Sequence, residues 1–358
     1  MGKIMVIIDG MGDSPDFFPR ELMQMGRAGA YGTLLTRPAS HPADSLPCIA
    51  TLLGVPACQI PRGRAGVEAL SRGLDLTGKL AFRCNLVTCD GDGRILSSCG
   101  AGLSPREKAE AFRRAAPLFA ARGMSLFYLG DYRGLILTEG TRRELCSLRT
   151  SAPHAHLGED WKSLLPRGTA LGKTLSLIAR ESARVLGKAA LLPWDGAGAP
   201  ALPAFASLHG LTGAAVCAAD VVRGLVRGMG MDLPDVPGAT GDIDTDLRAK
   251  ARAALDAAKD HDFVLLHLGG ADEAAHRKDG QAKRSFLCRV GKEVIAPLVR
   301  REDLELLVCG DHSTLWRTGS HVSFPQPFFL RKRDVGGNLG IRGGRDAVRL
   351  LCGEGGNG

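Results

Sequence analysis

The sequence predicts an α/β fold in which a mostly parallel sheet is flanked by helices. Two observations lead to this fold class. Three short apolar segments, 3–9, 262–272 and 304–312, each end at a glycine and an acidic residue. Segments with helical patterns lie between them, and alternation of strands and helices is typical of parallel sheets.

The first predicted strand runs from Lys3 to Asp9 and is rich in β-branched residues. A short, continuously apolar run of this kind is typical of a strand buried on both faces. The same design recurs at 262–268, which leads to Asp272, and at 304–309, which leads to Asp311. Ligands of open α/β sheets bind beyond the carboxyl ends of the strands. We therefore expect the three acids at one ligand-binding edge.

Three helices are predicted between these strands. Ser104 and Glu107 form a capping box with Pro105 at the first helical position, and Gly123 marks the end of that helix. Residues 245–259 are rich in alanine and lysine, which favour helix. Residues 285–300 form the third helical pattern.

A second domain is predicted as an insertion into the first. Residues 78–188 lack any cluster of acids and histidines, yet they carry strand patterns at 82–88 and 125–129 and a helix of their own. We therefore expect one domain made of residues 1–77 and 189–358, and a smaller inserted domain at 78–188.

Composition excludes several classes of protein. Of 358 residues, 44% are hydrophobic, 23% charged and 5% aromatic, which is an ordinary globular balance. The net charge of +8 is dispersed rather than gathered in runs with aromatics, so no nucleic-acid partner is expected. No apolar run approaches the ~20 residues that span a bilayer, and the first residues do not match an export signal. We expect a cytoplasmic protein without a membrane partner.

The residues after the predicted strands suit a metal centre. They provide three carboxylates and three imidazoles: Asp9, Asp272, His276, Asp311, His312 and His321. Mixed nitrogen and oxygen ligands suit zinc, manganese or iron, and six ligands exceed the needs of one tetrahedral ion. Two ions about 3.5–4 Å apart would clamp the attacking and leaving oxygens of a phosphoryl transfer. The alternative is that the acids are helix caps and that Asp272 and His276 share an exposed helix face.

Ser45 is the candidate nucleophile. It lies in a loop just before an apolar helical segment at 46–53. A hydroxyl that contacts a metal there would have a lowered pKa and could act as an alkoxide near neutral pH. The alternative is an N-cap serine for that helix, and the two roles are compatible.

The chain resembles a known family over nearly its whole length. The motifs that carry the resemblance are Ile7 to Asp13, Asp44-Ser45 with Leu52-Leu53-Gly54, Gly63-Arg64 with Glu68, Phe82 to Thr88, Val236 to Gly241 with Asp244-Thr245, Asp272 to His276, and Asp311-His312 through His321. Their order and number resemble the archaeal-type cofactor-independent (2,3-bisphosphoglycerate-independent) phosphoglycerate mutases of the alkaline phosphatase superfamily. The resemblance implies an alkaline-phosphatase-like core with a smaller inserted α+β domain.

The resemblance also implies roles for the site residues. Asp9, Ser45, Asp311 and His312 would bind one divalent metal, and Asp272, His276 and His321 the other. Manganese is the expected metal, with zinc and magnesium as alternatives. Ser45 would carry the phosphoryl group between the two hydroxyls of glycerate, while the inserted domain excludes water.

Substrate recognition requires cations for a phosphate and a carboxylate. The candidates in or near family-like motifs are Arg64, Arg83 and Arg133, with Asn85 and His154 as helpers; the alternative for each arginine is an ordinary surface role. Several positions depart from the family. Ala65-Gly66 replaces Gly-Pro, Ala275 replaces the glycine before His276, Ala155 replaces an acid, and Leu46-Pro47 follows the serine. These changes bear on glycerate specificity rather than on the metal site.

Three functions are therefore compared. The first is a mutase that interconverts 2-phosphoglycerate and 3-phosphoglycerate. The second is a phosphatase or phosphotransferase on another small phosphorylated metabolite, such as the homoserine kinase proposed for some relatives. The third is a metal-binding or regulatory protein without turnover. Mutase activity that needs no nucleotide or bisphosphoglycerate separates the first from the second, and a serine that never becomes labelled by phosphate would support the third. The sequence predicts no oligomeric state.

Overall fold

The computed structural model describes residues 1–353 and places the three predicted strands side by side. β1 (Gly2–Ile8) lies between β9 (Phe263–Leu268) and β10 (Leu304–Cys309), and all three run parallel. Nearly every residue in them is buried, because helices cover both faces of the sheet. The predicted strands are confirmed.

Four further strands complete a seven-stranded sheet in the order β14-β2-β13-β10-β1-β9-β8. Only β13 runs antiparallel to its neighbours, so the sheet is mostly parallel. This confirms the predicted α/β class. The added strands are β2 (Ala30–Leu35), β8 (Gly213–Val216), β13 (Gln326–Arg331) and β14 (Gly337–Gly343).

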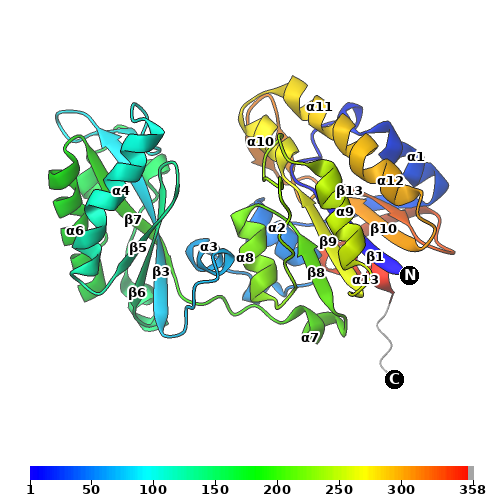
Figure 1. Cartoon of the computed structure of the whole chain (residues 1–358), viewed down its shortest axis with the longest axis horizontal. Helices are drawn as coiled ribbons and strands as arrows, with labels where there is room; N and C mark the ends of the chain where they lie inside the picture. The colour runs from blue at the N-terminus through cyan, green and yellow to red at the C-terminus, as the bar shows by residue number, and fades with distance from the viewer. Residues whose placement is uncertain (354–358) are drawn as a thin grey trace. The chain divides into compact units, whose positions relative to one another are not determined.

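Two sets of helices cover this sheet (Figure 1). The helices on one face bury the main hydrophobic core, and they are α1 (Arg20–Ala28), α9 (Leu247–Ala257), α11 (Gly280–Val290) and α12 (Ala296–Val299). The other face carries α2 (Ser45–Leu52), α8 (Asp220–Gly228) and α13 (Ala347–Cys352). The short helices α7 (Phe205–His209) and α10 (Gly270–His276) precede β8 and follow β9. No helix within residues 1–353 is both long and apolar enough to cross a bilayer.

The helix predicted at 285–300 differs in its bounds and regularity. It begins at Gly280, because the Asp279 carboxylate caps it by accepting a hydrogen bond from the backbone N–H of Ala282. A π-helical turn at Gly291–Ile295 separates α11 from α12. Pro297 follows this turn and has no backbone N–H to donate, which accounts for an irregular hydrogen-bond ladder here.

The inserted unit is an α+β structure with a sheet that is antiparallel throughout. β3 (Lys79–Cys89) is the central strand and pairs with β4 (Ile95–Ser97), β6 (Arg133–Glu139) and β7 (Ala189–Ala197), while β5 (Ser125–Gly130) pairs with β6. Helices α4 (Pro105–Ala120) and α6 (Ala170–Leu186) pack on one face of this sheet. The predicted capping box of Ser104 and Glu107 begins α4. The remaining helices are α3 (Ala65–Ser71) and α5 (Arg142–Ser147).

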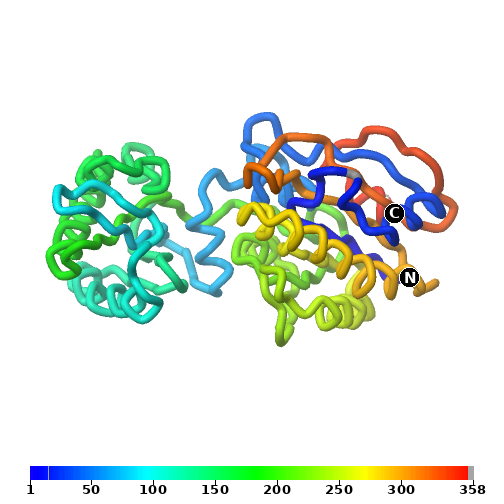
Figure 2. The backbone as a smooth tube through the Cα atoms, turned by 90° about the horizontal axis from the view of Figure 1, so that it is seen from above, coloured from blue at the N-terminus to red at the C-terminus, as the bar shows by residue number. Residues whose placement is uncertain are grey.

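The boundaries of the two units differ from the expected ones. One compact unit contains residues 1–62 and 201 onward, and the other contains Gly63–Pro200. In Figure 2 the first unit carries the blue segment of the chain and, from residue 201 onward, the yellow-green to red segments. The boundaries at 78 and 188 lie inside the inserted unit, because α3 packs on β3 and β7 and because β7 pairs with β3 along most of its length. This places Arg64 and Glu68 in the inserted unit.

Lys250 ties α9 to β9 and to the loop that contains Thr240. Its side chain is fully buried, and Nζ donates hydrogen bonds to the backbone carbonyls of Thr240 and His267 at 3.0 and 3.1 Å. Burial disfavours the ammonium and lowers the pKa of Lys250 to about 8. A neutral amine keeps two N–H donors, so both contacts persist in either charge state.

The variant Lys250→Met is expected to change how stability depends on pH. Between pH 8 and the ordinary lysine value of 10.5, the native state binds fewer protons than the unfolded state. The free energy of unfolding of the wild type, relative to that of the variant, should therefore rise with pH in this window. Below about pH 7, the difference in free energy of unfolding between the two proteins should not change with pH. Chemical denaturation from pH 7 to 10 in a chelator measures this, with the exposed Lys259→Met as the control. Parallel profiles for wild type and Lys250→Met would contradict the prediction.

Candidate active site

The carboxyl ends of β1, β9 and β10 meet at one edge of the sheet. Ile8 pairs with Leu268 and Ile7 with Cys309, so the residues that follow these strands are brought together. Asp9 follows β1, Asp272 lies in the first turn of α10 after β9, and Asp311 follows β10. Gly10 has a φ of +67°, and a Cβ there would lie 2.9 Å from the Cα of Asp272. Glycine is therefore required for the two loops to approach.

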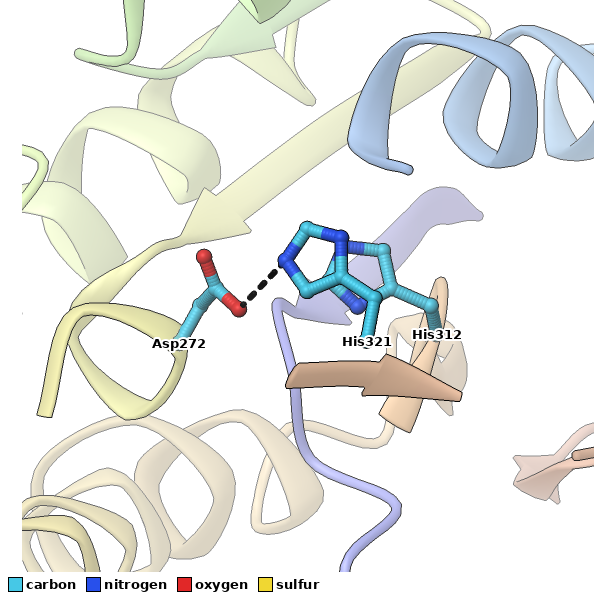
Figure 3. A group of neighbouring side chains, drawn as sticks. All are labelled: Asp272, His312 and His321. Carbon is cyan, nitrogen blue, oxygen red and sulfur yellow. Dashed lines mark ion pairs between the residues drawn. The ribbon is translucent and has the colours of Figure 1, made fainter. Parts of the chain in front are cut away.

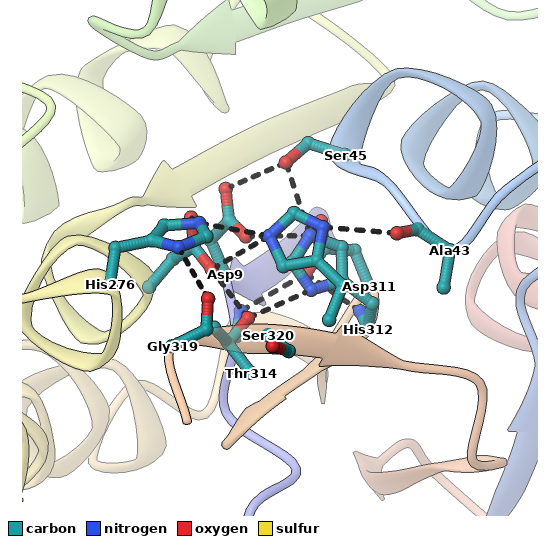
Figure 4. Close-up of polar contacts among 12 residues, drawn as sticks. Asp9, Ala43, Ser45, His276, Asp311, His312, Thr314, Gly319 and Ser320 are labelled. Atoms are coloured by element: carbon teal, nitrogen blue, oxygen red, sulfur yellow. Dashed lines mark hydrogen bonds and ion pairs between the residues drawn. The ribbon is translucent and has the colours of Figure 1, made fainter. Parts of the chain in front are cut away.

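The first cluster contains Asp9, Asp311 and His312, whose ligand atoms all lie within 4.8 Å of one another. His312 Nε2 is 3.3 Å from Asp9 Oδ1 and 3.4 Å from Asp311 Oδ2. Ser45 Oγ lies 3.4 Å from Asp9 Oδ2 and 3.2 Å from His312 Nε2 (Figure 4). The four residues predicted to share one metal therefore lie together.

The second cluster contains Asp272, His312 and His321, again within 4.8 Å of one another (Figure 3). His276 adjoins it, because His276 Nε2 lies 3.2 Å from Asp272 Oδ2 and 2.9 Å from His321 Nε2. The resemblance assigned His312 to one metal only, whereas the structure places it against both clusters. This makes His312 the side chain common to the two clusters.

Ser45 begins α2 as its first helical residue, and the N-cap position belongs to Asp44. The N-cap role considered for Ser45 is therefore wrong by one residue. The hydroxyl of Ser45 contacts Asp9 and His312 instead of a backbone N–H of its own helix. A group carried by Ser45 would lie at the positive end of the α2 dipole, which favours an anion.

The electrostatics of the clusters fit a cation. Burial raises the pKa of Asp9 well above its ordinary value, and the Asp311 and Asp272 carboxylates raise it further. Burial also raises the pKa of Asp311. Burial opposes ionisation of Asp272, but its contacts with His276 and His321 outweigh burial and lower its pKa. Asp9 Oδ1 and Asp311 Oδ2 are buried and accept no hydrogen bond. Buried carboxylates of this kind are satisfied by a bound metal ion.

Each imidazole is fixed through its Nδ1 atom. His276 Nδ1 lies 2.9 Å from the carbonyl oxygen of Gly319, and His321 Nδ1 lies 3.0 Å from that of Ala43. His312 Nδ1 lies 3.2 Å from Thr314 Oγ1. These contacts turn the three Nε2 atoms toward the carboxylates, which is the usual arrangement around a metal site. The contact with Ala43 also links His321 to the loop that carries Ser45.

Sequence reasoning missed three residues that support the clusters. His267 is buried in β9 with Nε2 3.2 Å from Asp9 Oδ2, and Thr314 donates its hydroxyl to Asp272 Oδ1. Burial lowers the pKa of His267 to about 3, so the ring is neutral. Lys283 is fully buried and reaches Asp13 at 3.2 Å and the carbonyl of Thr314 at 2.7 Å. Of these, only His267 left a signal in the sequence, as a histidine inside an otherwise apolar strand.

The five candidate substrate residues all lie in the inserted unit. Arg83 and Asn85 are two apart on β3, and Arg133 pairs with Asn85 across the sheet, so these side chains share one face. Arg83 Nε lies 3.3 Å from Glu68 Oε2. Burial raises the pKa of Glu68. The nearby arginines, of which Arg83 has the largest effect, lower this pKa but do not outweigh burial. The ring of His154 contacts the ring of Trp194 in β7. The backbone N–H of Arg64 donates to the carboxylate of Asp195, the next residue of β7.

Comparison with known proteins identifies the family. The model of the metalloenzyme superfamily matches residues 1–344. The chain is 30% identical to "2,3-bisphosphoglycerate-independent phosphoglycerate mutase 2" of Methanothermobacter thermautotrophicus, over 92% of this chain and 88% of that protein. It is 31% identical to a protein of the same family from Methanoculleus marisnigri, over 78% and 73%.

Two solved structures share the fold. The PH0037 protein from Pyrococcus horikoshii has a TM-score of 0.75 and 22% identity, over 98% of this chain and 96% of that one. The cofactor-independent phosphoglycerate mutase from Thermoplasma acidophilum has a TM-score of 0.64 and 22% identity, over 99% and 100%. The resemblance predicted from the motifs is confirmed: this chain belongs to the metalloenzyme superfamily and, within it, to the 2,3-bisphosphoglycerate-independent phosphoglycerate mutases.

Proposed function

We propose that this chain interconverts 2-phosphoglycerate and 3-phosphoglycerate by phosphoryl transfer through a phosphoserine on Ser45, with two divalent metal ions. The observation that carries the proposal is the position of Ser45 Oγ, 3.4 Å from Asp9 and 3.2 Å from His312, at the start of α2. Membership of the mutase family supports the substrate. Manganese is the proposed metal, because the ligands mix carboxylates with imidazoles.

Two sets of residues would hold the ions. Asp9, Ser45, Asp311 and His312 surround one position, and Asp272, His276 and His321 surround the other. When bound, the ions would lower the pKa of the Ser45 hydroxyl and neutralise charge on the transferred group. Buried Asp9 Oδ1 and Asp311 Oδ2, which accept no hydrogen bond, are suited to this role.

The chain's own residues define two half-reactions. Ser45 Oγ attacks phosphorus, the bond from phosphorus to one glycerate oxygen breaks, and that oxygen takes up a proton while the serine loses its own. The arginines of the inserted unit are the groups suited to bind a carboxylate or a phosphate. The other glycerate hydroxyl then attacks phosphorus, loses its proton and returns Ser45 to its free form.

A coupled assay tests the proposal. Purified protein, manganese and 3-phosphoglycerate are mixed with enolase, which reports 2-phosphoglycerate, in the absence of any bisphosphoglycerate. We expect product that disappears with a chelator and returns with added metal. Release of inorganic phosphate without 2-phosphoglycerate would favour the alternative, a phosphatase of the same metal and serine chemistry. If folded, metal-loaded protein forms neither product, the mutase proposal is contradicted and a phosphatase or phosphotransferase acting on another phosphorylated metabolite is favoured.

A further inference from the structure

One tryptophan contacts three of the five candidate substrate residues. The guanidinium carbon of Arg83 lies 4.5 Å from the centroid of the Trp194 ring, and the ring of His154 meets it edge-on at 5.4 Å. The indole Nε1–H donates to Asn85 Oδ1 at 2.8 Å. Asn85 Nδ2 donates to the carbonyl of Ser98 at 3.0 Å, so both ends of this buried amide are held.

The next residue holds a fourth candidate. Trp194 pairs with Arg83, but Ala197 pairs with Ala81, so β7 carries one extra residue at this point. Asp195 occupies the resulting bulge with a φ of +50°, and its Oδ2 accepts the backbone N–H of Arg64 at 2.9 Å. A Cβ on Gly63 would lie 2.3 Å from Asp195 Oδ1, so the segment before α3 packs tightly on this carboxylate. Bulges of this kind are found where a strand redirects side chains beside a site.

Neither side chain is itself an anion ligand. Trp194 offers one N–H, which Asn85 already accepts, and the Asp195 carboxylate would repel a phosphate. Their contacts act on the cationic and amide groups instead. The indole face and Glu68 confine Arg83, whose side chain is only 17% exposed, between two neighbours. A guanidinium confined in this way loses less freedom when it binds an anion.

We propose that Trp194 and Asp195 are positioning residues that pre-organise the anion-binding face of the inserted unit, Trp194 through Arg83 and Asn85, and Asp195 through the backbone of Arg64. The identity of the anion as a phosphoglycerate rests on the proposed function. The positioning itself concerns any phosphate-bearing ligand and is tested with inorganic phosphate.

The first experiment follows Arg83 directly in the full-length protein. Phenylglyoxal modification of Arg83 is measured by peptide mass spectrometry, with and without inorganic phosphate, in wild type, Trp194→Phe and Trp194→Leu. We expect Arg83 to react several-fold faster in Trp194→Leu, with little protection by phosphate. Trp194→Phe keeps an aromatic face for Arg83 and should react as slowly as wild type. Trp161→Phe, which changes a buried tryptophan of another cluster in the same unit, is the control.

The second experiment separates binding from turnover. In Trp194→Leu we expect KM for 3-phosphoglycerate to rise about tenfold while kcat changes by less than about threefold, as when a ground-state binding interaction is lost. Asp195→Asn keeps an acceptor oxygen and tolerates positive φ, so its KM should stay near that of wild type. Asp195→Gly keeps the backbone conformation but removes the acceptor, and its KM should rise.

The outcomes distinguish this inference from the proposed function. One outcome is that the wild type shows no mutase turnover, while phosphate protects Arg83 from modification in the wild type but not in Trp194→Leu. This would contradict the proposed function and support the positioning role. Normal turnover, with unchanged KM and unchanged Arg83 reactivity in Trp194→Leu, would overturn the positioning role and leave the function in place. If phosphate does not protect Arg83 in wild type, the inference is also overturned.

Discussion

Replacing Ser45 by alanine is expected to lower kcat for 3-phosphoglycerate by at least about 10⁴-fold, as is typical when a nucleophile is removed. The proposed reaction passes through a bond between phosphorus and Ser45 Oγ, and no other described hydroxyl lies against both Asp9 and His312. The hydroxyl of Thr314 contacts His312 and Asp272 instead. It therefore cannot replace Ser45 at the first cluster.

The same variant should keep its fold and most of its metal. Ser45 is the first residue of α2, where alanine is well tolerated and no cap hydrogen bond is lost. The measurements are kcat in the coupled assay, metal content by mass spectrometry, and transfer of a ³²P label to the protein. Ser40→Ala, in the exposed part of the preceding loop, is the matched control. A Ser45→Ala enzyme within tenfold of wild-type activity would refute the nucleophile assignment.

The position of the metal clusters could be predicted because it depends on local signals. An apolar run that stops at an acid predicts a buried strand with a polar end, as in β1 and Asp9. Parallel pairing then brings such ends together without any knowledge of side-chain contacts. The histidines His276, His312 and His321 follow these acids in the sequence and could be included on the same grounds, whereas their division between two metals came from the resemblance to the mutase family.

The supporting residues could not be predicted because their partners are distant in the chain. Asn85 and Trp194 are 109 residues apart, and Lys283 and Asp13 are 270 apart. Their contacts depend on strand register, and in β7 on a bulge of one residue that changes which side chains lie on the same face of the sheet as those of β3. The boundary at Gly63 has the same origin, because α3 belongs to the inserted unit through its packing on β3 and β7.

The variant Asp311→Asn is expected to have opposite effects on the metal-free and metal-loaded protein. Asp311 Oδ1 accepts the backbone N–H groups of Gly10 and His312, and asparagine can keep both contacts through its own oxygen. Oδ2 is buried, accepts no hydrogen bond and lies in the same cluster as Asp9. An amide there removes one charge and offers N–H donors to Asp9. Without metal, the variant should be more stable than wild type by roughly 1–3 kcal/mol, the usual cost of an unsatisfied buried polar group.

With metal present the order should reverse. Loss of one carboxylate ligand weakens metal affinity, while the wild type gains about 4 kcal/mol when free metal exceeds the dissociation constant a thousandfold. Thermal unfolding in a chelator and in excess manganese measures both effects, and Asp256→Asn, at an exposed position of α9, controls for charge alone. If Asp311→Asn is less stable than wild type in the chelator and gains as much from manganese, the carboxylate serves the fold rather than a metal. A change in the order of stability between chelator and manganese is expected only if Asp9 Oδ1 and Asp311 Oδ2, the two buried carboxylate oxygens without hydrogen bonds, bind a cation.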